Sequence, residues 1–395
     1  MTTSSLFQAL GLNIHVWKPT IAAGSYIPKG TYIYSRIENF ITGYSHEIAS
    51  QGGFVSASIT IAGSKEYVEE WIADGLGRHI EIYNSDLAVV WSGFVDAYDA
   101  QVGTLATSGG PLMNVVNRTT VMYTPIDYSA DPPARGPLTE TLTADDADSQ
   151  TKYGILETVY NGGERADYSA YRVRDALIQD MKDPSRSERV IPGQATSASI
   201  TLNCKGYFNF LSKYVYNDTT TGSISVRNKI LAALGDDPNN VISIDYSKID
   251  ENLILVAASE TDNKTAWDVI NGLVSIGTAT DERTFFGVYE NERVIYFQTP
   301  TDIEYLHRIA DRDQRVKTYD GGALVRPWDV RPAQWIFLPD YLTGRVQALT
   351  DLRQDPRNIL VERVLYTAPY MLEINGQRFG TLPQLLAKTG LGGIA

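Results

Sequence analysis

The stretch GGFVSASITIAG, residues 52–63, decides the fold class of this chain. Val55, Ala57, Ile59 and Ile61 alternate with small polar residues, which is the period of a strand that buries one face. The sequence that follows, as far as residue 98, repeats this texture with one interruption. The first third of the chain is therefore predicted to be a β-sheet that carries one helix.

The interruption is SKEYVEEWIADGLG, residues 64–77, whose apolar residues follow a helical spacing. Ser64 is placed to cap the start of a short helix, and Gly75 is placed to take a left-handed stop. The predicted buried stripe consists of Tyr67, Val68, Trp71 and Ile72.

Alternation returns in HIEIY, residues 79–83, and in AVVWSGFVDAY, residues 88–98. Asn84-Ser-Asp between them has turn chemistry. Strands, one short helix and a hairpin of this size predict a small barrel with a flanking helix.

The texture changes near residue 128. YSADPPARGPL, residues 128–138, is proline-rich and predicts turns or a linker. A helix is predicted over residues 169–181, with Val173, Leu177 and Met181 on one face, ending at Asp183-Pro184. The charged segment KDPSRSERVIPGQ, residues 182–194, is predicted to be a loop.

The third region mixes strands and helices. SASITLN (197–203) alternates, while SVRNKILAALG (225–235) and TAWDVINGLVSIG (265–277) have helical stripes, the second capped by Thr265 with Asp268 three residues later. RTFFGVYENERVIYFQT (283–299) predicts a hairpin with its tip at Glu290, Asn291 and Glu292.

The predicted class is therefore β-rich α+β, multidomain, with small β-barrels and flanking short helices. Four segments are expected: 1–127, a barrel-like domain with one helix; 128–194, a linker and helical segment; 195–300, an α+β domain with a helix-plus-hairpin module; and 301–395, a C-terminal β-containing domain and tail.

Composition limits the classes of function. The 395 residues carry 34 Lys and Arg against 47 Asp and Glu, a net charge of −13 with no long basic run. Such a surface does not grip phosphate backbones as a whole. No stretch of about 20 apolar residues predicts a membrane-spanning segment, and the first residues do not read as a signal peptide. We expect folding in a cytoplasm, which makes the sequons at Asn117, Asn217 and Asn263 chance matches.

Signatures of chemistry are missing at the places where they are usually found. A single cysteine, Cys204, rules out an internal disulfide or a multi-thiolate zinc site and reads as a half-buried thiol. No phosphate-binding glycine loop and no G-x-S-x-G elbow is present. The four histidines, His15, His46, His79 and His307, lack metal-ligand spacing.

Acidic and aromatic residues favour structural roles. Asp145, Asp146 and Asp148 lack the pattern of a calcium loop and are interpreted as helix-start acids. Trp71, Trp91 and Trp267 are interpreted as packing residues. Paired carboxylates for glycosidic chemistry stay open as a possibility in a chain with 47 acids. We therefore predict a non-enzyme with no catalytic, cofactor-binding or metal-binding residues.

The order of the segments carries a resemblance. Residues 31–124, with the Gly52-Gly53 turn, EEWIADGLG, HIEIY and VWSGFVDAY, resemble the opening domain of tailed-phage baseplate hub and tail-tip hub proteins. Ser149, Tyr153 and Gly154 before a helix are similar to the entry into their next domain. TAWDVINGLVSIG with the following hairpin resembles their helix-plus-two-strand module.

The resemblance is to siphophage-type hubs, related in architecture to those of contractile tails, and it implies a tail-tube-like barrel. It also implies a homotrimer in the virion tail tip, with the host cytoplasm as the place of assembly. The expected partners are the tail tube or distal tail protein, the tape measure protein and tip or fibre proteins, with DNA passing through the lumen. The alternatives are a hexameric distal tail (adaptor ring) protein, a part of a related injection system, and a carbohydrate-binding or glycan-degrading host-surface protein.

Overall fold

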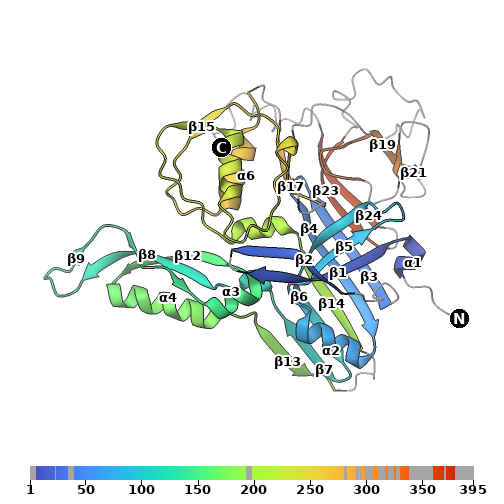
Figure 1. Ribbon diagram of the computed structural model, residues 1–395, viewed down its shortest axis with the longest axis horizontal. Coiled ribbons are helices and arrows are strands. Elements are labelled where there is room, and N and C mark those ends of the chain that lie inside the picture. Colours follow the sequence, from blue (N-terminus) through green and yellow to red (C-terminus); the bar gives the residue numbers. More distant parts are fainter. Residues whose placement is uncertain are drawn as a thin grey trace.

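The computed structural model describes most of the chain up to residue 298 and several segments after it. The described residues are 6–22, 24–33, 40–192, 198–279, 283–290, 293, 295–298, 306–309, 316–318, 324–325, 330–337, 359–368 and 371–378. Strands dominate and short helices flank them, which confirms the β-rich α+β class (Figure 1). In the described part of the chain, no helix is both long and apolar enough to cross a membrane.

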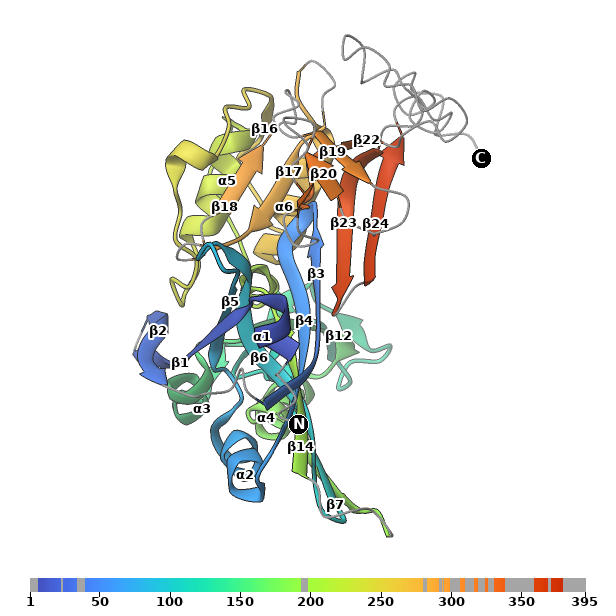
Figure 2. The same cartoon turned by 90° about the vertical axis from the view of Figure 1, so that its right-hand side faces the viewer.

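A long curved sheet forms the body of the molecule (Figures 1 and 2). Its pairings run in the order β2–β1–β5–β6–β14–β4–β3–β23–β24, and β7 and β13 continue beside the second half of β6. The strands are β1 (Asn13–Ala22), β2 (Ser25–Ile33), β3 (Ile41–Ala49), β4 (Gln51–Gly63), β5 (His79–Tyr83), β6 (Val89–Val102), β7 (Leu105–Gly109), β13 (Arg186–Val190), β14 (Ala198–Lys205), β23 (Ile359–Thr367) and β24 (Met371–Arg378).

The predicted barrel is not closed. Among the residues that the structure describes, β2 pairs with β1 alone and does not meet β3 or β24. The hydrophobic alternation identifies strands with one buried face, but it does not determine whether their sheet closes, because closure depends on register and shear. The body is therefore an open sheet with edges.

Strand β4 follows the predicted alternation with one shift. Ala57, Ile59 and Ile61 are buried, as expected, but Phe54 takes the core position that Val55 was expected to fill. The register between β3 and β4 shifts at this point, and such a bulge turns the residues before it to the opposite face.

Helix α2 (Lys65–Asp74) confirms the predicted short helix. The Ser64 hydroxyl accepts a hydrogen bond from the backbone of Tyr67, and Val68 and Trp71 are buried. The predicted left-handed stop is wrong, because Gly75 has φ −82° and Gly77 takes the positive φ instead. Gly75 is required for space, since a Cβ there would lie 2.3 Å from the Trp71 carbonyl oxygen.

A second unit packs on the sheet and has its own core. Its elements are η3 (Tyr207–Ser212), β15 (Ser223–Ser225), α5 (Val226–Gly235), η4 (Tyr246–Lys248), β16 (Leu255–Ala257), α6 (Ala266–Ile276), β17 (Phe285–Val288) and β18 (Ile295–Gln298). The predicted Thr265 cap is confirmed, with its hydroxyl accepting from the backbone of Asp268 at 3.1 Å. The predicted hairpin pairs β17 with β18, and its tip lies partly outside the described residues.

The two units meet where β17 pairs in parallel with the start of β4. Gly53 has φ +75° there, and a Cβ on it would lie 2.4 Å from the Val288 carbonyl oxygen. Only glycine permits both this conformation and this close approach. The Gly52-Gly53 turn therefore joins the first sheet to the hairpin of the second unit.

The four predicted segments stay a prediction as domain boundaries. The sheet crosses all three of them, because β13, β14 and β23 pair with β7, β4 and β3 of the first segment. After residue 300 the structure describes the backbone of β19 (Leu306–Ile309), β20 (Val316–Thr318), β21 (Leu324–Val325) and β22 (Trp335–Phe337) in addition to β23 and β24. The predicted C-terminal tail and the side chain of His307 lie outside the described residues.

Candidate assembly interface

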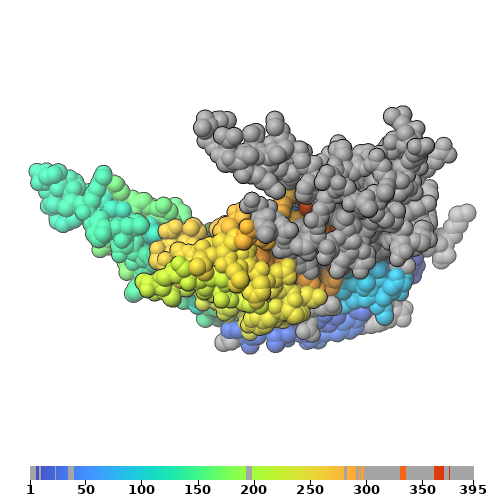
Figure 3. All heavy atoms as spheres, turned by 90° about the horizontal axis from the view of Figure 1, so that it is seen from above, coloured from blue at the N-terminus to red at the C-terminus, as the bar shows by residue number. Residues whose placement is uncertain are grey.

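An arm built from residues 118–182 projects from the body (Figures 1 and 3). Its central strand is β8, which pairs in parallel with β12 on one edge and with three short strands on the other. The elements are β8 (Arg118–Asp127), β9 (Ala134–Arg135), β10 (Thr139–Glu140), β11 (Ala144–Asp145), α3 (Ala147–Tyr153), β12 (Glu157–Arg165) and α4 (Asp167–Met181). The proline-rich segment expected as a linker forms the turn at the end of this arm.

The arm has a small hydrophobic core. Val121 and Tyr123 of β8 pack against Ala170 of α4, with Val173 and Leu177 beside them as the predicted helix face requires. Five apolar side chains are few for a projection of this length, because short chains bury too little surface to be stable alone. The arm therefore depends on the contacts that join it to the body.

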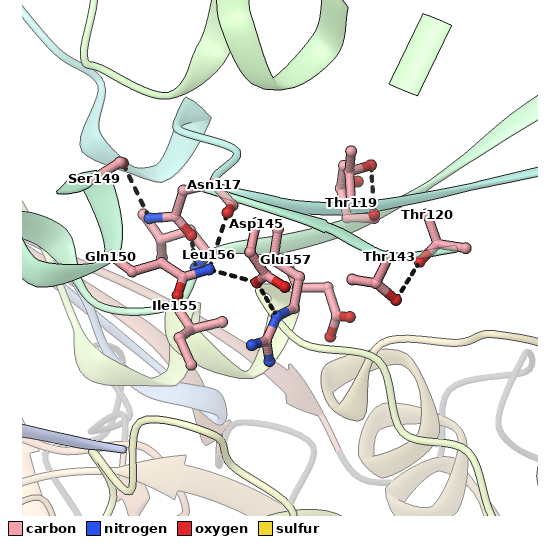
Figure 4. Close-up of polar contacts among 12 residues, drawn as sticks. Asn117, Thr119, Thr120, Thr143, Asp145, Ser149, Gln150, Ile155, Leu156 and Glu157 are labelled. Atoms are coloured by element: carbon pink, nitrogen blue, oxygen red, sulfur yellow. Dashed lines mark hydrogen bonds and ion pairs between the residues drawn. The ribbon is translucent and has the colours of Figure 1, made fainter. Parts of the chain in front are cut away.

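A buried amide at the base of the arm supplies the first of these contacts (Figure 4). The Asn117 side chain, which is fully buried, donates to the Ser149 hydroxyl at 3.1 Å and the Gly154 carbonyl at 2.7 Å. The side-chain oxygen of Asn117 accepts a hydrogen bond from the backbone amide of Leu156 at 2.8 Å. The backbone carbonyl of Asn117 accepts one from the Gln150 side chain at 3.0 Å. Asn117 therefore ties β8, α3 and the entry to β12 together.

A second asparagine continues the junction into the second unit. The Asn239 side chain exchanges both hydrogen bonds with the backbone of Ile155, at 2.6 and 2.7 Å, and its carbonyl accepts from the backbone of Tyr26 at 2.8 Å. The Asn239 side chain therefore pairs with the backbone of Ile155 in the way that a residue of a neighbouring strand would. Because these groups are buried, leaving any of them unpaired is costly.

A third asparagine supports the arm farther out. The Asn263 amide donates to the Glu140 carboxylate at 2.8 Å, and its oxygen accepts from Asn217, whose oxygen in turn accepts from the Asn263 backbone at 3.2 Å. The asparagines at the three sequon-like sites, Asn117, Asn217 and Asn263, therefore all take part in hydrogen bonds that hold the arm. Asn263 also has φ +52°, a conformation that asparagine tolerates better than most residues.

Replacing Asn263 by glycine is expected to loosen the arm without straining the backbone. Glycine accepts the positive φ, so the change removes the side-chain hydrogen bonds to Glu140, Met122 and Asn217 without straining the backbone. We expect a loss of about 1 kcal/mol and faster amide exchange over residues 139–145, measured by hydrogen–deuterium exchange. The matched control, Asn161→Gly, alters an exposed asparagine on β12, and equal exchange in the two variants would contradict the bracing role.

The three aspartates at the start of α3 take part in local structure. Asp146 caps the helix through the backbone of Ser149 and binds Lys182, and these contacts lower its pKa. Asp145 pairs with Arg118 at 2.7 Å, and Asp148 lies in the first helical turn. In the described ranges, no group of three potential ligands is placed to hold a metal ion.

Several large apolar side chains of the arm are exposed. Exposed apolar side chains are candidate contacts for other proteins where they lie together on one surface. The exposed large apolar residues of the arm are Tyr128, Leu138, Leu142, Tyr160 and Tyr168.

Strand edges form the other candidate contacts. The segment of β13 was predicted to be a loop, but it pairs with β7, and all five of its residues are exposed. A strand that buries neither face shows no alternation, so the prediction failed there. Within the described ranges, β13 has no partner on its second edge, and β12 has a strand partner only in β8.

One buried cluster has the order of groups found in hydrolases. Tyr207 and His79 Nδ1 are 2.8 Å apart, and His79 Nε2 lies 3.3 Å from Glu81. All three residues are at most 2% exposed, so a substrate has no access to them. Lys29 at 2.8 Å and the Tyr83 hydroxyl complete the contacts of Glu81. Burial would raise the pKa of Glu81, but these partners lower it to about 2.

His46 is a second buried histidine, in contact with Tyr44 through its Nδ1 at 2.8 Å. Burial, assisted by the charge of Arg331, lowers its pKa from 6.5 to about 3. The unfolded chain therefore takes up the proton first, and stability is full above pH 6.5 and falls as the pH drops toward 3. Cys204 is also buried, which raises the pKa of its thiol.

Replacing His46 by glutamine is expected to remove part of this acid sensitivity. Between pH 7 and pH 5, the free energy of unfolding of the wild type should fall by about 2 kcal/mol more than that of the variant, as measured by urea titration. If the free energy of unfolding of the His46 variant depends on pH as strongly as that of the wild type, His46 takes up its proton equally in the folded and unfolded states.

Of the aromatic residues chosen from the sequence, Trp71 and Trp91 are buried in the first core, and Trp267 packs against Phe208 and Phe286. The packing interpretation is confirmed for all three.

A group of aromatic side chains on the surface was not predicted from the sequence. His15, Trp17, Tyr32 and Tyr83 lie on one face of β1, β2 and β5, with ring centroids 4.9–5.8 Å apart. Its members come from three strands, so no local period reveals it.

Comparisons with known proteins give two solved structures of interest. No family model and no curated protein matches the sequence. The 43 kDa tail protein of prophage MuSo2 from Shewanella oneidensis aligns over 92% of this chain and 96% of its own, with 6% identity and a TM-score of 0.39. The tail protein from Neisseria meningitidis MC58 aligns over 90% of this chain and 92% of its own, with 8% identity and a TM-score of 0.38.

Proposed function

We propose that this chain is a structural, non-enzymatic protein of a phage tail. The observation that carries the proposal is the arm, which projects from the body and exposes apolar side chains, together with the edges of β12 and β13, which have no second strand partner among the described residues. Surfaces of this kind belong to proteins that assemble with others. The resemblance of residues 31–124 to tail-tip hubs supports the same reading.

Within the tail, the proposed role is the hub of the tip, a homotrimer that joins the tail tube to the tip proteins and encloses the DNA exit channel. The partners are then the tail tube or distal tail protein, the tape measure protein and the tip or fibre proteins. The net charge of −13 supports passage of DNA without binding, because acidic walls repel phosphates. The distal tail protein is the alternative within this class.

Two measurements test this proposal. Light scattering of the purified chain should give three times its 43.7 kDa, whereas six times that mass would favour the distal tail protein. Antibody–gold labelling should mark the tail tip of phage particles produced from the genome that encodes the chain. Particles that carry no label anywhere on the tail would overturn the proposal.

A carbohydrate-binding role is a second candidate, favoured by the aromatic group of His15, Trp17, Tyr32 and Tyr83. Aromatic rings on one face are the usual platform for sugars, although these rings also pack against each other. A glycan array compares the wild type with Tyr32→Ala, which removes a side chain that is 48% exposed. Binding of a defined glycan that the variant loses would favour this candidate, and release of reducing sugar would make it an enzyme.

A further inference from the structure

Two strand edges of the same chain are open in the described structure. Strand β13 lies at the outer side of β7, and the outer half of β12 lies along the arm (Figure 1). Open edges present rows of backbone donors and acceptors, and these rows accept an added strand from another protein. A chain with two such edges can supply both sides of one contact.

Strand β13 gains little from its own chain. An ordinary edge strand buries one face, but all five residues of β13 are exposed, and Val190 is 70% exposed opposite Leu105 at 40%. Fixing a residue in an extended conformation costs roughly 1–2 kcal/mol of conformational entropy. Its pairing with β7 along a single edge offsets part of this cost, and a second neighbour would offset more of it.

The edge of β12 has the matching character. Tyr160 is 42% exposed on it, and Tyr168, which is 71% exposed, follows at the start of α4. The arm over residues 118–182 has 7 basic and 11 acidic side chains, a net charge of −4. Strand β13 has Arg186 and Arg189 against one Glu188, a net charge of +1 within an acidic chain. Strand β12 itself has Glu157 and Glu164 against one Arg165, a net charge of −1, so opposite charges favour the approach of these two edges.

The two edges lie in different parts of the molecule. The arm projects to one side of the body, while β13 lies at its lower end (Figures 1 and 2). A contact between them therefore joins different copies head to tail, and such contacts close into rings when the rotation permits. We propose that β13 of one copy adds to the free edge of β12 in the next copy. This inference deepens the proposed function and rests on its ring-forming assembly.

Disulfide trapping tests the contact directly. Asn161→Cys places a thiol on β12, and Ser187→Cys places one on β13, both at exposed positions. Cys204 is buried and gives a quiet background. After mild oxidation, an equimolar mixture of the two variants should give a disulfide-linked dimer on a non-reducing gel, and each variant alone should not. The control mixture pairs Ser187→Cys with Leu253→Cys, which is 78% exposed on the second unit.

Charge exchange gives an independent readout. Arg189→Glu should weaken self-association by up to about five-fold, as measured by sedimentation. Glu164, which is exposed on the outer half of β12 and pairs with Arg135 at 3.0 Å, is the acidic partner offered to Arg189, and Glu164→Lys in the same chain should restore the association. A mixture that crosslinks no more than the control overturns the contact, as does crosslinking of the Ser187 variant with itself. If light scattering still shows a trimer in that case, only this contact is wrong and the proposed function stands.

Discussion

Replacing Asn117 by alanine is expected to lower the free energy of unfolding by about 4 kcal/mol. The change leaves the Gly154 carbonyl and the Leu156 amide without their partner inside the protein, and each unpaired buried group costs about 1–3 kcal/mol. It also opens a small cavity at the point where β8 enters the arm. Urea unfolding followed by circular dichroism measures the loss, and amide exchange should rise across residues 118–182.

Asn161→Ala is the matched control for this prediction. Asn161 is exposed on β12, and its side-chain oxygen accepts a hydrogen bond from the backbone amide of Gly163, two residues later. We expect a change within about 0.5 kcal/mol, as for most surface substitutions. If Asn117→Ala unfolds at the same urea concentration as this control, the base of the arm is held by the surrounding backbone hydrogen bonds and not by the amide.

Local elements of the fold could be predicted because their signals lie within a few residues. The alternation of β4, the stripe and cap of α2 and the aromatic runs of β17 and β18 each report one buried face. The arm could not be predicted in this way. Its sheet pairs β8 with β12 in parallel, and other elements separate these two strands in the sequence. Pairing between strands that are distant in sequence produces no local hydrophobic pattern from which it could be predicted.

The candidate interface was harder to see than the fold. Asn117 reads in sequence as part of a sequon, and only burial among three backbone segments reveals its role. Strand β13 reads as a charged loop because neither of its faces is buried. Surfaces that serve other molecules lack the burial that makes a pattern, so a single sequence contains little signal for them.

The ion pair between buried Glu81 and half-buried Lys29 leads to a second large effect. Glu81→Gln is expected to destabilise the protein by about 3 kcal/mol at pH 7, because Lys29 loses the carboxylate that balances its charge and His79 loses a hydrogen-bond partner. The sign of the pH dependence follows from the pKa of Glu81, which is about 2 in the folded protein against 4.5 as the ordinary value. The stabilisation is complete above pH 4.5 and is lost as the pH falls toward 2.

The difference between wild type and Glu81→Gln should therefore narrow in acid, by about 1 kcal/mol at pH 4, as measured by urea titration at both pH values. Glu47→Gln is the control, since Glu47 pairs with Arg363 at 2.6 Å on the surface, where an ion pair contributes less than about 1 kcal/mol. A difference that stays constant from pH 7 to pH 4 would show that Glu81 acts through hydrogen bonds that glutamine cannot make. A narrowing difference would identify the charge of Glu81 itself as the group that stabilises this part of the sheet.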